Sequence, residues 1–275
     1  MPSMNPACLE AARAALVAAR RTARAVAYWP AEWQPDDLEA AYRLQSAIAS
    51  DLGPVGGWKI AAVTAAQRAS LGVARPLGAP VPAAWMRDAD RDAAEFGVAE
   101  FIAPKLECEF AFELGRDLPP RPQAPYSRAE VEAAVVALRL AIEVVDSRLP
   151  RGSGTLAELA DAFNSGALVC GRALRDWQGL DFAATRIVLH ALGTGEPAGA
   201  AGSELALGSG AAILDGDPFG TVVMLANAQP SGGAGLRAGH VVTTGSCTGA
   251  PPLPGPGLYR AEFDGLGSVE VRFLA

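Results

Sequence analysis

The segment KLECEFAFEL at 105–114 carries the side chains whose types and spacing best suit chemistry. Its apolar residues alternate with Glu107, Glu109 and Glu113, a period of two that predicts a strand with one apolar face and one carboxylate face. The Cα atoms of Glu107 and Glu109 are then roughly 6.5 to 7 Å apart, with side chains pointing the same way. Two buried carboxylates raise each other's pKa unless a cation keeps both ionised, and an oxygen-only ligand set suits Mg²⁺ or Mn²⁺.

A third acid is expected from the segment AIEVVDSRL at 141–149, whose β-branched residues predict a strand. Glu143 stands in its apolar part, where a lone buried carboxylate needs a partner. Asp146 and Arg148 follow on the same predicted strand. The alternative is that the glutamates of 105–114 simply face water on a half-exposed strand, and spacing alone favours that alternative.

The elements that position these residues begin with two helices. Asn5 and Pro6 form an N-cap and N1 pair that predicts a helix to about Ala27, and a second helix is predicted from Asp37 to Leu52. Two further helices are expected after the capping box that begins at Ser127 and after the pair Asp217-Pro218. The chain therefore divides into a small helical part at 1–55 and a β-rich catalytic domain at 56–275.

Most other segments of the β-rich part predict short strands. They are RIVLHAL, AGHVVTTGS and the pair LYRAEF and SVEVRFL, which is joined through Asp264-Gly265. The order is not a regular alternation of strands and helices. We therefore expect an α+β fold in which a mixed, mostly antiparallel sheet is bent into a roll or barrel behind the helical part.

Composition excludes several classes of function. The 275 residues carry a net charge of -7, so no basic face for nucleic acid is expected, and no apolar run is long enough to span a membrane. The four cysteines form no CxxC pair, which favours reduced thiols and a cytoplasmic location. The chain also has no Walker loop, no complete dinucleotide fingerprint and no nucleophile elbow.

Six ordered blocks of the chain resemble the fumarylacetoacetate hydrolase superfamily, in its branch of 2-keto-4-pentenoate hydratases and 4-oxalocrotonate decarboxylases. The resemblance covers most of the chain and implies the roll-like fold of that superfamily. The blocks are GGWKIAAVTAAQRASLGV at 56–73, PKLECEFAFELGRDLP at 104–119, AIEVVDSRL at 141–149, LADAFNSGALVCG at 159–171, GSGAAILDGDPFGTVVMLAN at 208–227 and VVTTGSCTG at 241–249.

The resemblance implies a metal site and a catalytic lysine. The glutamates of the E-x-E strand and of the following strand hold a divalent ion in that family, which assigns Glu107, Glu109 and Glu143 as ligands of Mg²⁺ or Mn²⁺. The lysine of the G-W-K block implies that Lys59 lies in the active site, as a proton donor or an anchor for an oxyanion. Burial would lower its pKa. The alternative is a solvated lysine at a strand end.

Other residues are candidates for substrate binding. Lys105 and Arg148 could bind a substrate carboxylate or only pair with the glutamates. Ser246 and Thr248 lie in a Gly-rich turn that could cradle a carboxylate, or form a turn and nothing more. Asp146 could orient Lys59 or Arg148 from a second shell, although an ordinary ion pair is the simpler account.

The reaction implied by the resemblance acts on a small 2-oxo acid of aromatic catabolism. A divalent ion chelated by such an acid stabilises an enolate, which hydration and decarboxylation both need. Our leading hypothesis is a carbon-oxygen lyase that adds water to a 2-hydroxy-2,4-dienoate. The alternatives are a carboxy-lyase acting on 4-oxalocrotonate (2-oxo-3-hexenedioate) and a catalytically inactive metal-binding partner subunit. C–C hydrolysis is disfavoured because the hydrolase branch uses a histidine, and the first histidine here is His190.

Two departures from the family pattern leave the substrate open. Leu77 replaces an acidic residue expected near the mouth of the active site, and Ala162 replaces an asparagine. These changes are the features that favour the inactive partner subunit, whereas the retention of Lys59 and the three glutamates argues against it. The resemblance also implies a homo-oligomer and association with a related decarboxylase or hydratase.

Overall fold

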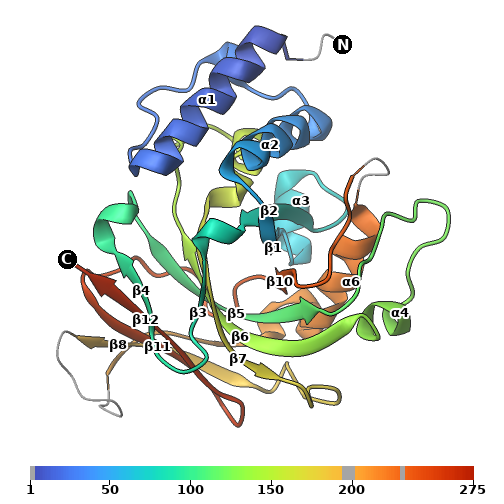
Figure 1. Ribbon diagram of the computed structural model, residues 1–275, viewed down its shortest axis with the longest axis vertical. Coiled ribbons are helices and arrows are strands. Elements are labelled where there is room, and N and C mark those ends of the chain that lie inside the picture. Colours follow the sequence, from blue (N-terminus) through green and yellow to red (C-terminus); the bar gives the residue numbers. More distant parts are fainter. Residues whose placement is uncertain (1–3, 194–201, 230–232) are drawn as a thin grey trace.

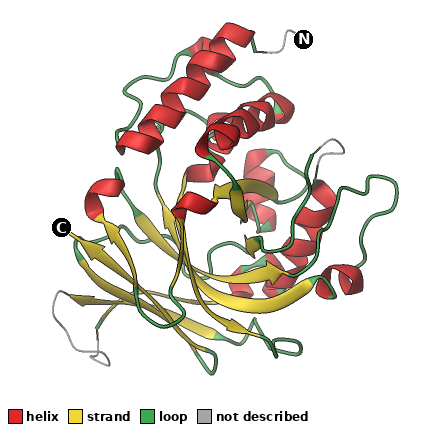
Figure 2. Ribbon diagram, in the orientation of Figure 1, coloured by secondary structure: helices red, strands yellow, loops and turns green. Residues whose placement is uncertain are grey.

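A computed structural model describes residues 4–193, 202–229 and 233–275. Two curved sheets form most of the molecule, and a layer of helices from the N-terminal part covers one side of the larger sheet (Figure 1). Of the described helices, none is both long and apolar enough to cross a membrane. Figure 2 shows a mixed α+β protein, whose longer helices lie above and to the right of the two sheets.

The N-terminal layer consists of α1 (Pro6–Thr22) and α2 (Leu38–Leu52). Both predicted N-caps are present, because Asn5 accepts the N–H of Ala7 and Asp37 accepts that of Ala40. Helix α1 ends before the predicted Ala27, since Ala23 adopts a left-handed conformation and its N–H bonds back to the carbonyl of Ala19. Helix α2 ends at Gly53 as predicted.

This layer shares its apolar core with a later segment of the chain. Leu16 of α1 and Leu44 of α2 pack in one buried cluster with Leu149 and with Ala157 and Ala160 of α5 (Thr155–Ala160). The division of the chain at residues 55 and 56 stays a prediction, and α5 contributes to the core of the helical layer from within the predicted β-rich part.

The larger sheet has seven strands and is mixed. Two of its neighbouring pairs are parallel, β1 with β10 and β3 with β7, and its other pairs are antiparallel. In spatial order the strands are β2 (Leu77–Pro82), β1 (Val55–Ala61), β10 (Val241–Thr243), β5 (Lys105–Leu114), β6 (Val135–Val145), β7 (Ser165–Leu174) and β3 (Met86–Asp88).

The smaller sheet has five strands and packs against the first. Only the pair of β4 with β12 is parallel. The order is β4 (Ala94–Gly97), β12 (Gly267–Leu274), β11 (Gly257–Phe263), β8 (Arg186–Gly193) and β9 (Ser203–Ser209). The mostly antiparallel pairing agrees with the predicted fold class.

The main core lies between the two sheets and α6 (Pro218–Ala228). The apolar face of β5 enters this core, where Phe110 meets Phe263 edge to face and Phe112 meets Phe219 in the same way. Because side chains alternate along a strand, this burial turns the glutamate face of β5 in the opposite direction, away from the aromatic core.

Further predicted elements also differ in extent from the observed ones. Strand β6 begins at Val135 and ends at Val145, so Asp146 and Arg148 lie beyond the strand that was predicted to carry them. The helix after Ser127 has its capping box but is only α4 (Arg128–Glu132), because the chain enters β6 shortly afterwards. The remaining helix is the short α3 (Ala65–Leu71).

Candidate functional site

Three carboxylates cluster on the face of the larger sheet that turns away from the aromatic core. Glu107 of β5 lies directly opposite Glu143 of β6 in the antiparallel register, and Glu109 follows two residues along β5. One carboxylate oxygen from each of the three residues lies within 4.8 Å of the other two. Glu109 and Glu143 are fully buried, whereas Glu107 is partly exposed. The cluster is therefore least buried at Glu107.

Lys59 joins this cluster from β1. The parallel register of β1 with β10 places Lys59 on the face that also carries the glutamates. Its Nζ atom lies 3.0 Å from Oε1 of Glu143 and donates to the carbonyl of Phe163 at 3.1 Å. Lys59 is only 5% exposed, so the alternative of a solvated lysine at a strand end is wrong.

The carboxylates have fewer hydrogen bonds than their burial requires. Oε2 of Glu109 accepts the backbone N–H of Gly245 at 2.8 Å. Oε1 of Glu109 and Oε2 of Glu143 are buried without a hydrogen-bond partner among the described residues. A buried carboxylate oxygen left without a donor is costly, and a divalent cation among three such groups removes that cost. The residues present therefore fit a divalent ion.

Gly245 approaches Glu109 through a backbone that favours glycine. Its φ is +102°, and a Cβ atom at this position would lie 2.8 Å from Cγ1 of Val63. The N–H donated to Glu109 thus depends on a residue without a side chain.

Burial and like charge dominate the protonation of the cluster. Burial raises the pKa of Glu109 well above its usual range, and the charges of Glu143 and Glu107 raise it further. Burial also raises the pKa of Glu107 to about 7, against the lowering effect of Lys59. For Lys59, burial lowers the pKa, but the three glutamates outweigh burial and the net shift is upward. The expectation of a lowered pKa for Lys59 is therefore wrong.

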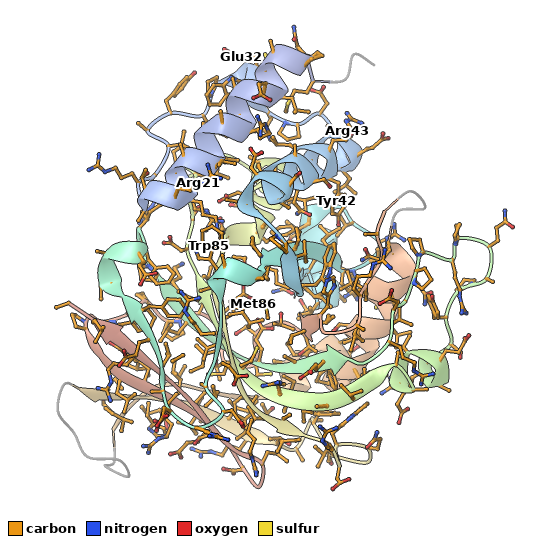
Figure 3. The ribbon with its side chains drawn as sticks, viewed as in Figure 1. Arg21, Glu32, Tyr42, Arg43, Trp85 and Met86 are labelled. Carbon is orange, nitrogen blue, oxygen red and sulfur yellow. The ribbon has the colours of Figure 1, made fainter. Side chains whose placement is uncertain are left out.

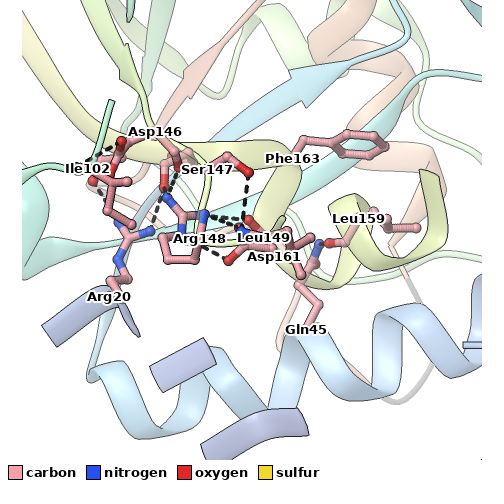
Figure 4. A network of polar contacts seen from close by, with 12 residues as sticks. Arg20, Gln45, Ile102, Asp146, Ser147, Arg148, Leu149, Leu159, Asp161 and Phe163 are labelled. Carbon is pink, nitrogen blue, oxygen red and sulfur yellow. Dashed lines mark hydrogen bonds and ion pairs between the residues drawn. The ribbon is translucent and has the colours of Figure 1, made fainter. Parts of the chain in front are cut away.

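Arg148 is fully engaged away from the carboxylate cluster. Its Nε donates to Oδ1 of Asp161 at 2.9 Å, and its Nη groups donate to the backbone carbonyls of Asp146, Ser165 and Asp161. The residue is 2% exposed. Figure 4 shows its contacts with Asp161 and the neighbouring backbone. The guanidinium group supports the backbone around Asp161 and pairs with that carboxylate instead of with the three glutamates. Its role in substrate binding stays a prediction.

Asp146 lies beside Arg148 but does not orient Lys59. Its carboxylate accepts the backbone N–H groups of Ile102 and Ala103, the latter at 2.8 Å. Only its backbone carbonyl contacts Arg148. The side chain therefore fixes the segment that leads into β5.

Ser246 and Thr248 fold the Gly-rich turn against β5. The hydroxyl of Ser246 donates to the carbonyl of Gly249 at 2.8 Å, and that of Thr248 accepts the N–H of Cys108 at 3.3 Å. Lys105 is exposed at the start of β5, two residues before Glu107 and on the same face. Of the two predicted substrate-binding cations, Lys105 is therefore exposed, whereas Arg148 is buried.

The structure adds residues that the sequence did not indicate. The carbonyl of Phe163 contacts Lys59, and backbone carbonyls carry no signature in a sequence. Leu77 is 3% exposed and belongs to an apolar cluster against which Phe163 packs. The effect of its replacement of an acidic residue on the substrate stays a prediction.

Comparisons with known proteins agree with this geometry. A 2-keto-4-pentenoate hydratase from Burkholderia vietnamiensis is 33% identical over 86% of this chain and 86% of its own length. A 4-oxalocrotonate decarboxylase from Pseudomonas sp. (strain CF600) is 29% identical over 64% of this chain and 62% of its own length. No protein-family model matches the chain.

A solved structure gives the same result for the fold. The 4-oxalocrotonate decarboxylase from Pseudomonas putida G7, complexed with magnesium and adipate, superposes with a TM-score of 0.84 at 22% identity, and both chains are covered completely. The chain belongs to the fumarylacetoacetate hydrolase superfamily, in its branch of 2-keto-4-pentenoate hydratases and 4-oxalocrotonate decarboxylases. The predicted family and the predicted fold class are both confirmed.

Proposed function

We propose that the protein is a divalent-metal-dependent hydratase that adds water to a 2-hydroxy-2,4-dienoate of the 2-keto-4-pentenoate type. The product is a 4-hydroxy-2-oxo acid. The observation that carries this proposal is the buried cluster of Glu107, Glu109 and Glu143 with Lys59 against it. The names of the relatives support the same reaction, since they include 2-keto-4-pentenoate hydratase and 2-hydroxyhexa-2,4-dienoate hydratase.

The ion in this proposal is Mg²⁺ or Mn²⁺, held by Glu107, Glu109 and Glu143. Magnesium is present in the similar decarboxylase structure, and manganese with pyruvate in a more distant fumarylpyruvate hydrolase from Pseudomonas aeruginosa. When bound, the ion supplies Lewis-acid stabilisation of the oxyanion that a 2-oxo acid forms. The unpartnered buried oxygens of Glu109 and Glu143 are where such an ion is needed.

Lys59 handles the proton in this proposal. Its Nζ atom lies 3.0 Å from the Glu143 carboxylate, which favours the ammonium form, so the amine acts as a proton donor or anchors an oxyanion. The Glu143 carboxylate and the Phe163 carbonyl each contact Nζ. These two contacts fix the direction of the N–H groups that remain. Burial of Lys59 keeps bulk water from competing for its proton.

Lys105 binds the substrate carboxylate in this proposal. It is exposed at the Glu107 side of the cluster, whereas Arg148 is occupied by Asp161 and by backbone carbonyls.

Decarboxylation remains the second candidate because of one specific likeness. The fold superposes over its whole length on a 4-oxalocrotonate decarboxylase that holds magnesium and adipate, a six-carbon dicarboxylate. The same carboxylate cluster serves both reactions, since each passes through an enolate of a 2-oxo acid.

Product analysis by proton NMR tests the proposed reaction and separates these candidates. The protein with Mn²⁺ is mixed in turn with 2-hydroxypenta-2,4-dienoate and 4-oxalocrotonate. A new carbinol signal at C4 supports hydration, and release of CO₂ without that signal supports decarboxylation. If neither substrate reacts while Mn²⁺ still binds, the protein is an inactive metal-binding partner subunit.

Assembly and location complete the proposal. A homo-oligomer is proposed from the resemblance to this family alone. Association with a related decarboxylase or hydratase is proposed on the same basis. The four cysteines, all within the described residues, are free thiols, which supports a cytoplasmic location. Light scattering during gel filtration tests the assembly, and a strictly monomeric mass at every concentration would contradict it.

A further inference from the structure

Three consecutive residues beside Lys59 adopt a left-handed backbone conformation. Ala162, Phe163 and Asn164 have φ values of 52°, 47° and 62°, and none of them is glycine. This conformation crowds the Cβ atom of an L-residue, and asparagine alone of the three tolerates it well. Such a segment, which we call the left-handed turn, persists only where surrounding contacts over-determine it.

One set of these contacts comes from the segment after β6. Asp161, the residue before the turn, accepts hydrogen bonds from Arg148 through its carboxylate and its backbone carbonyl. Ser165, the residue after the turn, accepts one from Arg148 through its backbone carbonyl. The N–H of Asp146 donates to the carbonyl of Asn164 at 2.6 Å. The turn is therefore fastened at both ends from one side.

A second set comes from the N-terminal helical layer. Arg20, in the last turn of α1, donates to the carbonyls of Ser165 and Gly166, the latter at 2.7 Å, and its guanidinium lies 4.5 Å from the ring centroid of Trp85. Trp85 lies between the helical layer and the larger sheet (Figure 3). From α2, Gln45 donates to the carbonyl of Leu159 at 2.6 Å. The helical layer thus reaches the same backbone that Arg148 holds (Figure 4).

The left-handed turn has one direct consequence at the site. It points the carbonyl of Phe163 at Nζ of Lys59, at 3.1 Å, while Glu143 lies 3.0 Å from the same atom. A right-handed conformation at Phe163 would turn that carbonyl elsewhere and leave the buried ammonium ion with one fewer acceptor. The direction of the remaining N–H groups of Lys59 therefore depends on the turn.

We propose that Arg20 is a positioning residue for Lys59, which it reaches through the left-handed turn. By holding the carbonyls of Ser165 and Gly166, Arg20 keeps the turn in place and so keeps the Phe163 carbonyl against Lys59. This gives the helical layer a role in the active site. The kinetic consequence rests on the proposed function, in which Lys59 handles the proton, but the structural part is testable without substrate or metal.

The amino-acid composition provides a clean spectroscopic probe. The chain has 23 basic residues, and only Lys59 and Lys105 among them are lysines. Protein labelled with [ζ-¹⁵N]lysine therefore has two side-chain amine resonances, of which that of the exposed Lys105 is an internal control. The experiment compares Arg20→Gln, the conservative Arg20→Lys and the matched control Arg24→Gln, which removes an exposed charge just beyond the end of the same helix.

The metal-free spectra decide the proposal. In Arg20→Gln the Lys59 resonance shifts and its protons exchange faster with water, whereas Lys105 is unchanged. Arg20→Lys shows a smaller shift, because one ammonium group replaces a fork that spans two carbonyls, and Arg24→Gln shows none. An unmoved Lys59 resonance in Arg20→Gln overturns the proposal even if the melting temperature falls. If that variant does not fold, an unmoved resonance in Arg20→Lys overturns it.

Kinetics then separate positioning from the proposed function. With Mn²⁺ and a 2-hydroxydienoate, kcat of Arg20→Gln falls by about tenfold to a hundredfold, since a small displacement of a proton-handling group is costly. Its KM and its affinity for Mn²⁺ stay at the wild-type values. A wild-type kcat in a variant whose Lys59 resonance has shifted contradicts the kinetic part. If the wild-type protein does not act on the dienoate, the proposed function fails, and the spectra still decide the role of Arg20.

Discussion

The carboxylate cluster and the left-handed turn both contact Lys59, but they are built in different ways. The cluster consists of side chains on two paired strands, and regular register alone brings Glu107 opposite Glu143. The turn consists of irregular backbone that hydrogen bonds from Arg20, Arg148 and Asp146 hold in place. The carboxylate cluster therefore depends on local periodicity, and the left-handed turn depends on contacts between distant parts of the chain.

The largest expected effect comes from breaking the support of the turn. Arg148→Met leaves the carboxylate of Asp161 buried without its partner, which costs about 3 to 5 kcal/mol of the free energy of unfolding. Urea denaturation measures this loss. The control is Arg128→Met, which breaks an exposed pair with Asp217 and costs less than about 1 kcal/mol. Equal losses in the two variants would show that the buried pair does not hold the turn.

The next effect separates the proton-handling residue from the ion. Lys59→Met lowers kcat by about 10² to 10⁴-fold, the range for losing a general acid or base. Removing a positive charge beside three carboxylates leaves the affinity for Mn²⁺ unchanged or higher. Steady-state kinetics and Mn²⁺ titration of the same preparation check both statements. A variant with normal kcat would remove Lys59 from the mechanism.

A smaller effect is expected at Lys105, the exposed lysine at the start of β5. Lys105→Met raises KM by about tenfold, because one charged hydrogen bond to the substrate carboxylate is lost, while kcat changes little. The effect shrinks as salt is added, since Lys105 is exposed. Initial rates at two ionic strengths provide the measurement. An unchanged KM at low salt would assign the substrate carboxylate to another group.

The smallest expected effect concerns the backbone strain of the left-handed turn. At Ala162 the φ of 52° strains alanine but not glycine. We therefore expect the free energy of unfolding of Ala162→Gly to be about 0.5 to 1 kcal/mol higher than that of the wild type, after the greater chain entropy of glycine is subtracted. Thermal unfolding measures this gain. A lower melting temperature would mean that the left-handed conformation carries no strain at this position.

The same contrast explains what the sequence could predict. The alternation of KLECEFAFEL and the β-branched residues around Glu143 predict two strands, because strand geometry is local, whereas the assignment of the three carboxylates to one ion comes from the family resemblance. The helix caps at Asn5, Asp37 and Asp217 were visible for the same reason. These features account for most of the fold.

The remainder depends on contacts that have no local signature. Arg148 was placed on the predicted strand of Glu143, as a group that binds substrate or pairs with the glutamates, but β6 ends at Val145 and the side chain turns to Asp161. Likewise, no pattern marks Arg20 as a partner of Ser165, a residue far along the chain. Buried lysines are also hard to judge from sequence, because the sign of the pKa shift of Lys59 depends on three carboxylates whose distances only the fold sets.

Calorimetric titration with Mn²⁺ tests the central claim most directly. Wild-type protein is compared with Glu109→Gln, which removes one charge at constant shape. The control is Glu113→Gln, which makes the same change farther along the same face of β5, where Glu113 pairs with Arg139. We expect one site in the wild type, an affinity lowered by more than about 100-fold in Glu109→Gln, and wild-type affinity in Glu113→Gln. Equal affinity of the wild type and Glu109→Gln would contradict the metal site, and with it the proposed reaction.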